Sequence, residues 1–334
     1  MSFHAINIRV RGLREWCGVA GAAIVMLASV AASAQQYPSK PLRLIIPYPP
    51  GGGIDIVGRP LALRMSETLG QQVVVEHKGG ANGSIAMEYV AKSPADGYTI
   101  VLALNTQLAV NPSLYSALRY DPLKDFAPIA LLGSAPYVLV VNPKLPVNSV
   151  QQLIAYAKSH PGKLNYASSG NGSGAHLAGE LLKSTSGVDI IHVPYKATAD
   201  AVRDTMTGDA QIMFATFGSV RGQLEAKTLR AIAVSGLKRS PLAPELPTVA
   251  ESGFPGFETV VWYGILAPAG TPADIVTRLH GDIGKALASP EYRDRLRADA
   301  VELTGSTPAQ FQRYIGSELT KYTKIVKDSG AKLD

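Results

Sequence analysis

Short apolar runs alternate with segments of helical periodicity along most of the chain, and this alternation restricts the fold more than any other feature. The expected strands are residues 42–47, 73–76, 99–104, 137–141, 163–167, 190–193, 211–214 and 229–234. The expected helices are residues 55–69, 84–91, 150–159, 175–184, 197–206, 272–288, 290–298 and 308–328. Strands separated by single helices pair in parallel, so the pattern predicts an α/β fold. Pro60 falls inside the first expected helix, which therefore either begins near Gly58 or kinks at the proline.

The alternation of strand and helix forms two similar units, and we expect breaks between them near residues 141–143 and 258–264. If the C-terminal helices pack on the first unit, the chain crosses between the units twice. We therefore predict one lobe made of residues 35–141 and 260–334 and a second lobe made of residues 142–259. Two lobes joined by two crossovers can hinge about a cleft. The carboxyl ends of parallel strands would meet at that cleft, which is where ligands of such sheets bind.

The N-terminal segment has the features of an export signal. Arg9, Arg11 and Arg14 precede an uncharged run at residues 17–32, and the small residues 32–34 end it. The run is shorter than the ~20 apolar residues that a membrane anchor needs. We expect a Sec-type signal peptide at residues 1–34, cleavage after it, and a periplasmic protein of 300 residues.

Composition excludes several classes of protein. Hydrophobic residues make up 46% of the chain and charged residues 17%, which is too apolar for a disordered protein. The single cysteine, Cys17, rules out an intramolecular disulfide. Cleavage would lower the net charge from +6 to +4, and the remaining charges are spread along the chain, so we expect no nucleic-acid partner. The histidines lack metal-ligand spacing, and we expect neither a metal nor a cofactor.

Two Gly-rich loops join a strand to a helix, and both suit an anion. The first is PPGGG at residues 49–53, and the second is SSGNGSG at residues 168–174, followed by His176. Glycines let a ligand approach the backbone amides, and a helix N-terminus adds partial positive charge. The serine hydroxyls of the second loop can also donate to a carboxylate. The alternative is that the first loop only turns the chain and that the serines only cap a helix.

A hydrolase is the alternative activity. Ser168 or Ser169 could pair with His176 or His192 as nucleophile and base. However, the sequence around these serines lacks the Gly-x-Ser-x-Gly of a nucleophile elbow, and no paired carboxylates share a loop. We therefore expect a protein that is not an enzyme.

Several runs of sequence are distinctive when they are taken in order. They are YPSKPLRLIIPYPPGGGID (37–55), GQQVVVE (70–76), DGYT (96–99), YDPLKDFAP (120–128), PGKLNY (161–166), HVPYK (192–196), LPTVAE (246–251) and APAGTP (267–272). Together they resemble the Bug-type receptors, which are the periplasmic solute-binding proteins of tripartite tricarboxylate (TctC-like) transporters. The resemblance implies a type II periplasmic-binding-protein fold with a Venus-flytrap cleft. It also implies that small carboxylates bind through loop amides and bridging waters.

The resemblance further implies which positions bind the ligand. These candidate residues are Tyr48, Gly51, Gly52, Gly53 and Asp55 of the first loop, Asn105 and Thr106 after the third strand, Ser168, Ser169, Gly172, Ser173 and His176 of the second loop, Tyr195 and Lys196 of the next loop, and Ala215. The implied partner is the membrane permease of a tripartite transporter, to which a monomeric receptor delivers a small organic carboxylate. A receptor that serves a sensor kinase without transport is the alternative that the sequence leaves open.

Two positions depart from the family pattern. Many relatives have an Asp directly after Met-Phe, where it can meet a ligand amine, whereas Met213-Phe214 is followed here by Ala215. Relatives also tend to have Gly after Tyr-Lys, and Ala197 at that position would narrow the cleft locally. We therefore expect the ligand to be a carboxylate without an ammonium group.

Overall fold

The computed structural model describes residues 37–329. The chain divides into two units, residues 1–39 and residues 40–334, and the fold and the site reported below belong to the second unit. The expected signal peptide at residues 1–34 lies outside the described residues. Among the described helices, none combines the length and the apolar character needed to cross a membrane.

Three parallel strands begin the first sheet, in which β1 (Leu42–Ile46) lies between β2 (Val73–His77) and β3 (Thr99–Leu104). The helix α2 (Gly53–Leu69) follows β1, and its apolar side chains cover the sheet because Ile54, Val57, Leu61 and Met65 recur at helical spacing. We call this part of the molecule lobe 1. Its other elements are η1 (Ala81–Gly83), α3 (Ser84–Ala91), η2 (Thr106–Val110), α4 (Asn111–Leu114), α9 (Ala273–Ala288), α10 (Pro290–Arg297), β10 (Glu302–Leu303) and α11 (Pro308–Ser329).

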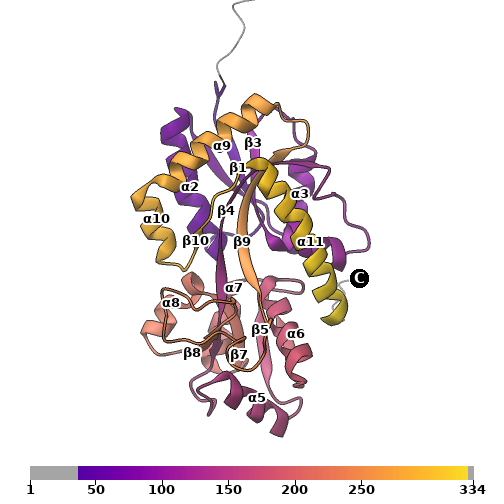
Figure 1. The fold of residues 1–334 in the computed structure, drawn as a ribbon, viewed down its shortest axis with the longest axis vertical. Coiled ribbons are helices and arrows are strands. Elements are labelled where there is room, and N and C mark those ends of the chain that lie inside the picture. The colour runs from indigo at the N-terminus through magenta and orange to yellow at the C-terminus, as the bar shows by residue number, and fades with distance from the viewer. Residues whose placement is uncertain (1–36, 330–334) are drawn as a thin grey trace, which may run out of the picture. The chain divides into compact units, whose positions relative to one another are not determined.

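The second sheet belongs to a group of elements that we call lobe 2, which lies below lobe 1 in Figure 1. In this sheet β5 (Asn165–Ser168) is parallel to both β6 (Ile191–Pro194) and β7 (Ile212–Thr216). A helix follows each of these three strands, and the sequence pattern predicts those after β5 and β6. The elements of lobe 2 are α5 (Val150–Ser159), β5 (Asn165–Ser168), α6 (Gly174–Ser186), β6 (Ile191–Pro194), α7 (Thr198–Thr207), β7 (Ile212–Thr216), α8 (Phe217–Glu225) and β8 (Arg230–Val234).

Two long antiparallel strands join the lobes, β4 (Phe126–Val141) and β9 (Val260–Pro268), and they run side by side in Figure 1. Up to Pro136, β4 pairs with β9 in the first sheet. From Tyr137 onward it pairs with β7 and β8 in the second sheet. The chain therefore changes from one sheet to the other between two consecutive residues.

A buried serine ties the two crossovers together at that point. Ser235 donates its amide hydrogen to the carbonyl of Tyr137 at 2.9 Å and accepts from the Tyr137 amide through its hydroxyl oxygen at 2.8 Å. The same hydroxyl donates to the carbonyl of Thr259, directly before β9. One side chain thus fixes the backbones of both crossovers where they pass between the lobes.

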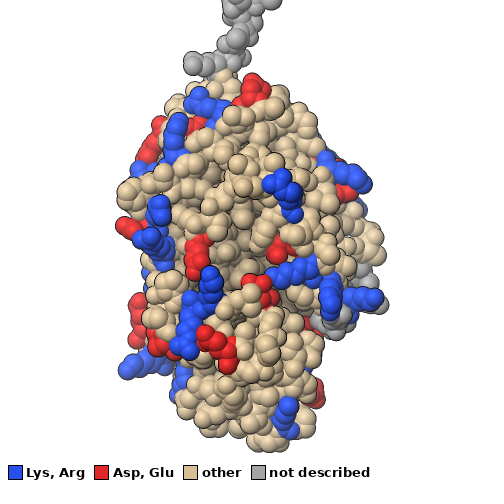
Figure 2. Space-filling view, viewed as in Figure 1, with Lys and Arg blue, Asp and Glu red and all other residues tan. Residues whose placement is uncertain are grey.

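The core of lobe 1 forms where α11 packs on β9. Trp262 is fully buried, its ring lies edge-on to Phe311 with 5.8 Å between centroids, and its indole nitrogen donates to Glu318 at 2.9 Å. Leu177 of α6 belongs to the same apolar cluster, and Ala300 of the lobe 1 segment after α10 belongs to the cluster of lobe 2. Each lobe therefore contributes apolar contacts to the core of the other. On the face shown in Figure 2, Lys and Arg are interspersed with Asp and Glu over both lobes.

The α/β fold class with two lobes and two crossovers is confirmed, whereas the lobe boundaries at residues 141/142 and 259/260 stay a prediction. Three details are wrong: β4 begins at Phe126 and not at residue 137, β9 forms where only a break was expected, and α8 was not expected. α2 begins at Gly53 with Pro60 inside it, which excludes the alternative start near Gly58. The sheets are also mixed and not wholly parallel, because both crossover strands run antiparallel to their neighbours.

Candidate functional site

A cavity of about 140 Å³ lies between the lobes. A water molecule needs about 10–15 Å³ of cavity volume. This cavity therefore has room for about nine to fourteen water-sized atoms. Lobe 1 and β9 contribute residues 48–54, 104, 106, 261 and 263 to its lining, and β4 and lobe 2 contribute residues 137, 169, 173–175, 196–199 and 213–216. Lys196 is the one charged side chain among the described residues of the lining.

Four helices begin at this cavity: α2, α6, α7 and α8. Each follows the carboxyl end of a parallel strand, which places its first-turn amides at the junction of the lobes. The residues before α2, α7 and α8 are Gly52, Ala197 and Thr216, and none of them caps its helix through a side chain. The amide of Asp55 in the first turn of α2 donates to the carbonyl of Gly52 at 3.0 Å. In the described part of the chain, no side chain occupies the other first-turn amides of these three helices, and the helix dipoles favour an anion there.

In lobe 1, a buried carboxylate shapes the glycine loop from behind. Asp55 accepts a hydrogen bond from the amide of Gly51 at 2.6 Å, and Gly51 has a φ of +89°, which glycine adopts without strain. The other carboxylate oxygen of Asp55 lies 3.3 Å from His77, whose second ring nitrogen lies 2.9 Å from the carbonyl of Tyr48. Asp55 thus holds the loop from behind, and Gly51, Gly52 and Gly53 line the cavity.

Tyr48 belongs to the lobe 1 wall of the cavity, and side chains of lobe 1 bond its hydroxyl. The hydroxyl accepts a hydrogen bond from the side-chain amide of Gln107 at 2.9 Å and donates to Oδ1 of Asn82 at 3.4 Å. Burial raises the pKa of Tyr48 to about 12, so its hydroxyl keeps its proton at neutral pH.

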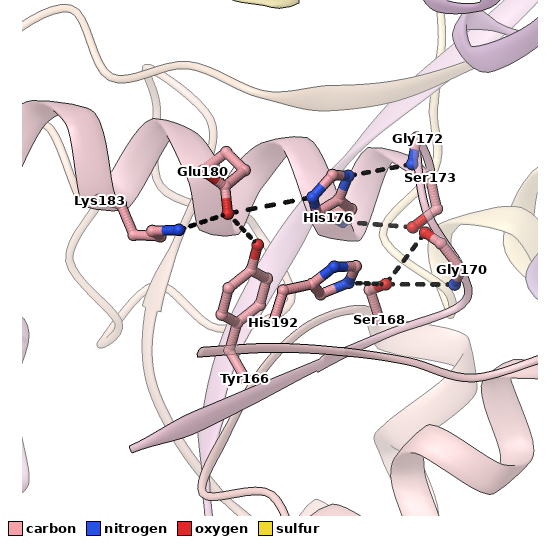
Figure 3. Close-up of polar contacts among 9 residues, drawn as sticks. All are labelled: Tyr166, Ser168, Gly170, Gly172, Ser173, His176, Glu180, Lys183 and His192. Carbon is pink, nitrogen blue, oxygen red and sulfur yellow. Dashed lines mark hydrogen bonds and ion pairs between the residues drawn. The ribbon is translucent and has the colours of Figure 1, made fainter. Parts of the chain in front are cut away.

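In lobe 2, two histidines hold the second loop from behind (Figure 3). The amide of Gly172 donates to Nδ1 of His176 at 3.0 Å, so this nitrogen carries a lone pair and no proton. Ser168 and Nε2 of His192 share a hydrogen bond of 2.6 Å. Ser173 caps α6 by accepting from the amide of His176 at 3.2 Å. The loop conformation therefore depends on side chains that lie behind the wall of the cavity.

The two imidazoles stack on each other and on a tyrosine. The ring centroids of His176 and His192 are 4.0 Å apart, and those of Tyr166 and His192 are 4.8 Å apart. Burial lowers the pKa of His176, and burial with the neighbouring His176 lowers that of His192 to about 3. Tyr166 donates to Glu180, which also accepts from Lys183 at 2.9 Å (Figure 3). Both histidines are accordingly neutral at ordinary pH.

The structure brings most of the candidate residues to one cavity. Those that line it are Tyr48, Gly51, Gly52, Gly53, Thr106, Ser169, Ser173, Lys196 and Ala215. Those that do not line it are Asp55, Asn105, Ser168, Gly172, His176 and Tyr195. Of the second group, Asn105 is buried and donates to Tyr322 at 2.9 Å and to the carbonyl of Val260 at 3.1 Å. It connects η2 to α11 and to the start of β9.

Sequence reasoning missed four polar residues of the lining: Tyr137, Thr198, Thr216 and Tyr263. Thr216 ends β7 and precedes α8, so the rule that ligands lie at strand carboxyl ends could have identified it. Tyr137 and Tyr263 lie within the crossover strands, where a tyrosine in an apolar run has the pattern of a core residue.

The structure places Ser168 and His192 in contact, but not as an exposed nucleophile and base. Ser168 is fully buried and lies outside the cavity lining, and its hydroxyl also bonds the backbone of Gly170. Among the described residues, no carboxylate pairs with His192, whose ring stacks on His176. The contact therefore serves the loop conformation. Within residues 37–329, no group of three or more metal-ligating side chains gathers.

Several known proteins are similar to this chain in sequence and in fold. The family model described as tripartite tricarboxylate transporter family receptor matches residues 57–331. The structure of Rpa4515 of R. palustris with adipate has a TM-score of 0.85 and 38% identity, and the match covers 89% of this chain and all of that one. The periplasmic binding protein BugD has a TM-score of 0.83 and 34% identity over 89% of this chain and all of its own. MatC of Rhodopseudomonas palustris with bound malate has a TM-score of 0.80 and 29% identity over 87% of this chain and all of its own. The chain therefore belongs to the Bug-type receptors of the tripartite tricarboxylate transporter family.

Proposed function

We propose that this protein captures a small organic carboxylate in the cavity between its lobes and delivers it to a tripartite tricarboxylate-type transporter. The observation that carries the proposal is the convergence of four helix N-termini on one small cavity. Their first-turn amides offer hydrogen bonds and partial positive charge without the desolvation cost of burying several lysines or arginines. The export signal at residues 1–34 and a periplasmic location are part of the same proposal.

The cavity supports a particular size and charge of ligand. Room for about nine to fourteen water-sized atoms suits a dicarboxylate of four to six carbons. The relatives whose structures contain adipate or malate hold ligands of this class. In the described lining there is no Asp or Glu, and Ala215 stands where a carboxylate could meet an amine. We therefore propose a ligand that lacks an ammonium group.

In this proposal the two lobes close around the ligand. The residues that line the cavity come from both lobes, so a ligand gains its full set of contacts when the lobes are together. A ligand that binds one arrangement more tightly shifts the population toward it. A transporter component could then select the loaded receptor by the relative position of the lobes.

A thermal-shift screen followed by calorimetry tests this function. The probes are the linear dicarboxylates from malonate to adipate, malate, hexanoate, aspartate and glutamate. We expect at least one dicarboxylate to raise the melting temperature, since a ligand that binds only the folded state stabilises it. Ser169 lines the cavity and should donate a hydrogen bond to the ligand through its hydroxyl. Ser169→Ala should therefore raise the dissociation constant of that dicarboxylate about tenfold. Binding of none of these acids would contradict the proposal, and tight binding of aspartate or glutamate would contradict the absence of an ammonium group.

A further inference from the structure

Tyr137 lies where the chain passes from one sheet to the other. The preceding residue, Pro136, pairs with Val260 of β9, whereas Tyr137 pairs with Thr216 of β7. The backbone of Tyr137 is held on both sides by Ser235. The position of its side chain is thus set by the crossover itself and not by a loop.

The hydroxyl of Tyr137 faces the cavity without a protein partner. The residue is 6% exposed and lines the cavity, yet within residues 37–329 no donor or acceptor bonds its hydroxyl. Among the described residues, the enclosed side-chain oxygens without a partner belong to Asp55, Asn105 and Thr259, so the Tyr137 hydroxyl oxygen is not enclosed but open to the cavity. A hydroxyl in this position is available to a ligand. Burial also raises the pKa of Tyr137 well above its ordinary value, so the hydroxyl is a donor at any physiological pH.

This hydroxyl lies against the first turn of α6. A methyl group added at Gly174, the first residue of that helix, would come within 1.9 Å of the hydroxyl oxygen, so only glycine allows the approach. The hydroxyl oxygen of Ser173 accepts from the amide of His176, which leaves its own proton free to donate. The tyrosine hydroxyl, the serine hydroxyl and the first amides of α6 therefore gather at one place in the lining.

The helix N-termini of the cavity lie close to one another. A methyl group at Gly53 would lie 3.0 Å from the hydroxyl of Thr216, so α2 and α8 begin beside each other. A methyl group at Gly170 would lie 3.5 Å from the carbonyl of Tyr195, so the loops that lead into α6 and α7 are neighbours. α7 and α8 are also in contact, and the backbone of Tyr137 pairs with Thr216 directly before α8. Tyr137 therefore lies among these N-termini, with its hydroxyl at the start of α6.

We propose that Tyr137 is a ligand-binding residue whose hydroxyl donates a hydrogen bond to a carboxylate oxygen held at the N-terminus of α6. A dicarboxylate would reach another helix N-terminus of the lining with its other carboxylate, and the apolar side chains of Ile54, Met213 and Val261 would contact the carbons between them. This inference rests on the proposed function and names a contact of that same site. It connects the ligand directly to the strand that joins the lobes.

Replacing Tyr137 by phenylalanine tests the contact, because Tyr137→Phe keeps the ring and removes only the donor. The probe is the tightest of the linear dicarboxylates from malonate to adipate, titrated by calorimetry into each variant. The control is Tyr292→Phe, since Tyr292 is also buried, but its hydroxyl bonds the carbonyl of Val57 away from the cavity. Melting temperatures of the free proteins report any loss of structure.

We expect Tyr137→Phe to raise the dissociation constant of the dicarboxylate about ten- to hundredfold, because this is the effect of losing a hydrogen bond to a charged group. The free variant should melt no lower than the wild type, because its hydroxyl has no partner in the protein. Tyr292→Phe should bind as the wild type does. An unchanged dissociation constant for Tyr137→Phe would overturn the inference while leaving the carboxylate receptor intact. If the wild type itself binds no dicarboxylate, the proposed function fails first.

Discussion

At the scale of single residues, the ligand cavity depends on a layer of side chains that never reach it. His176 bonds the amide of Gly172, His192 bonds Ser168, and Asp55 bonds the amide of Gly51. Each of these groups fixes a loop whose other surface lines the cavity. A substitution in this layer should therefore alter binding through loop geometry.

The stacked histidines make stability depend on pH. The pKa of His192 is about 3 in the folded protein and near 6.5 when the chain is unfolded, so between these values the unfolded state binds more protons. The free energy of unfolding should thus fall as the pH drops from about 6.5 toward 3. Urea titrations should show a shallower fall for His192→Asn, whereas His160→Asn, at an exposed position, should follow the wild type. Equal slopes for His192→Asn and the wild type would show that this ring does not titrate as its surroundings imply.

Glycine patterns in the sequence predict where a site lies better than which side chains line it. Gly51–Gly53 and the serine loop were expected to face a ligand, and both lie at the cavity. Asp55 and His176 were expected there too, but they lie behind the loops, because the sequence does not determine which side of a loop a neighbouring residue faces. The sequence does not distinguish Tyr137 from a core residue, because a core strand can also be an apolar run with one tyrosine.

At the scale of secondary structure, the sequence predicts the repeating βα units well and the crossovers poorly. Residues 126–136 contain Pro128, Gly133 and Pro136, which usually interrupt strands. The structure accommodates Pro128 and Gly133 at irregularities of register between β4 and β9. Strand propensity is local, whereas the partner that makes this segment a strand is more than a hundred residues away.

The packing of α11 on β9 should be sensitive to a single methyl group. A side chain at Gly264 would lie 2.0 Å from the ring of Phe311, which is fully buried. Overpacking of this kind costs about 1–3 kcal/mol, so Gly264→Ala should lower the free energy of unfolding by that amount. Gly281→Ala is the control, because Gly281 lies in α9 with open space around it and should be neutral or stabilising. Chemical denaturation of both variants measures the difference, and similar values for the two would contradict the packing argument.

At the scale of the whole unit, an ion pair joins α8 of lobe 2 to lobe 1. Arg221 of α8 in lobe 2 bonds Asp299 of lobe 1 at 2.9 Å, with side-chain exposures of 42% and 15%. A methyl group at Gly218 would also meet Ile56 of α2 at 2.6 Å, so the two helices are in close contact. These contacts form only when the lobes are together.

Removal of the ion pair should lower the affinity for the ligand, because it removes a contact between the closed lobes. A partly exposed pair contributes about 0.2–1 kcal/mol, so Arg221→Ala should weaken carboxylate binding by up to about fivefold at low salt. The difference from the wild type should shrink at high ionic strength, because salt screens the pair. Arg239→Ala is the matched control, since Arg239 and Glu251 form a pair of 2.8 Å within lobe 2. Calorimetry at two salt concentrations measures the affinities of the variants for the carboxylate. Equal affinities of Arg221→Ala and the wild type at low salt would show that the pair plays no part in closure.

The burial of Trp262 has an optical consequence. The chain contains two tryptophans, and the proposed cleavage after residue 34 would remove Trp16. The cleaved protein would then carry one tryptophan, Trp262, in the strand that returns from lobe 2 and between the cavity residues Val261 and Tyr263. Its emission spectrum reads the polarity around that strand without any attached label. The protein thus contains an intrinsic probe of a strand that joins the lobes, at a position flanked by two residues of the cavity lining.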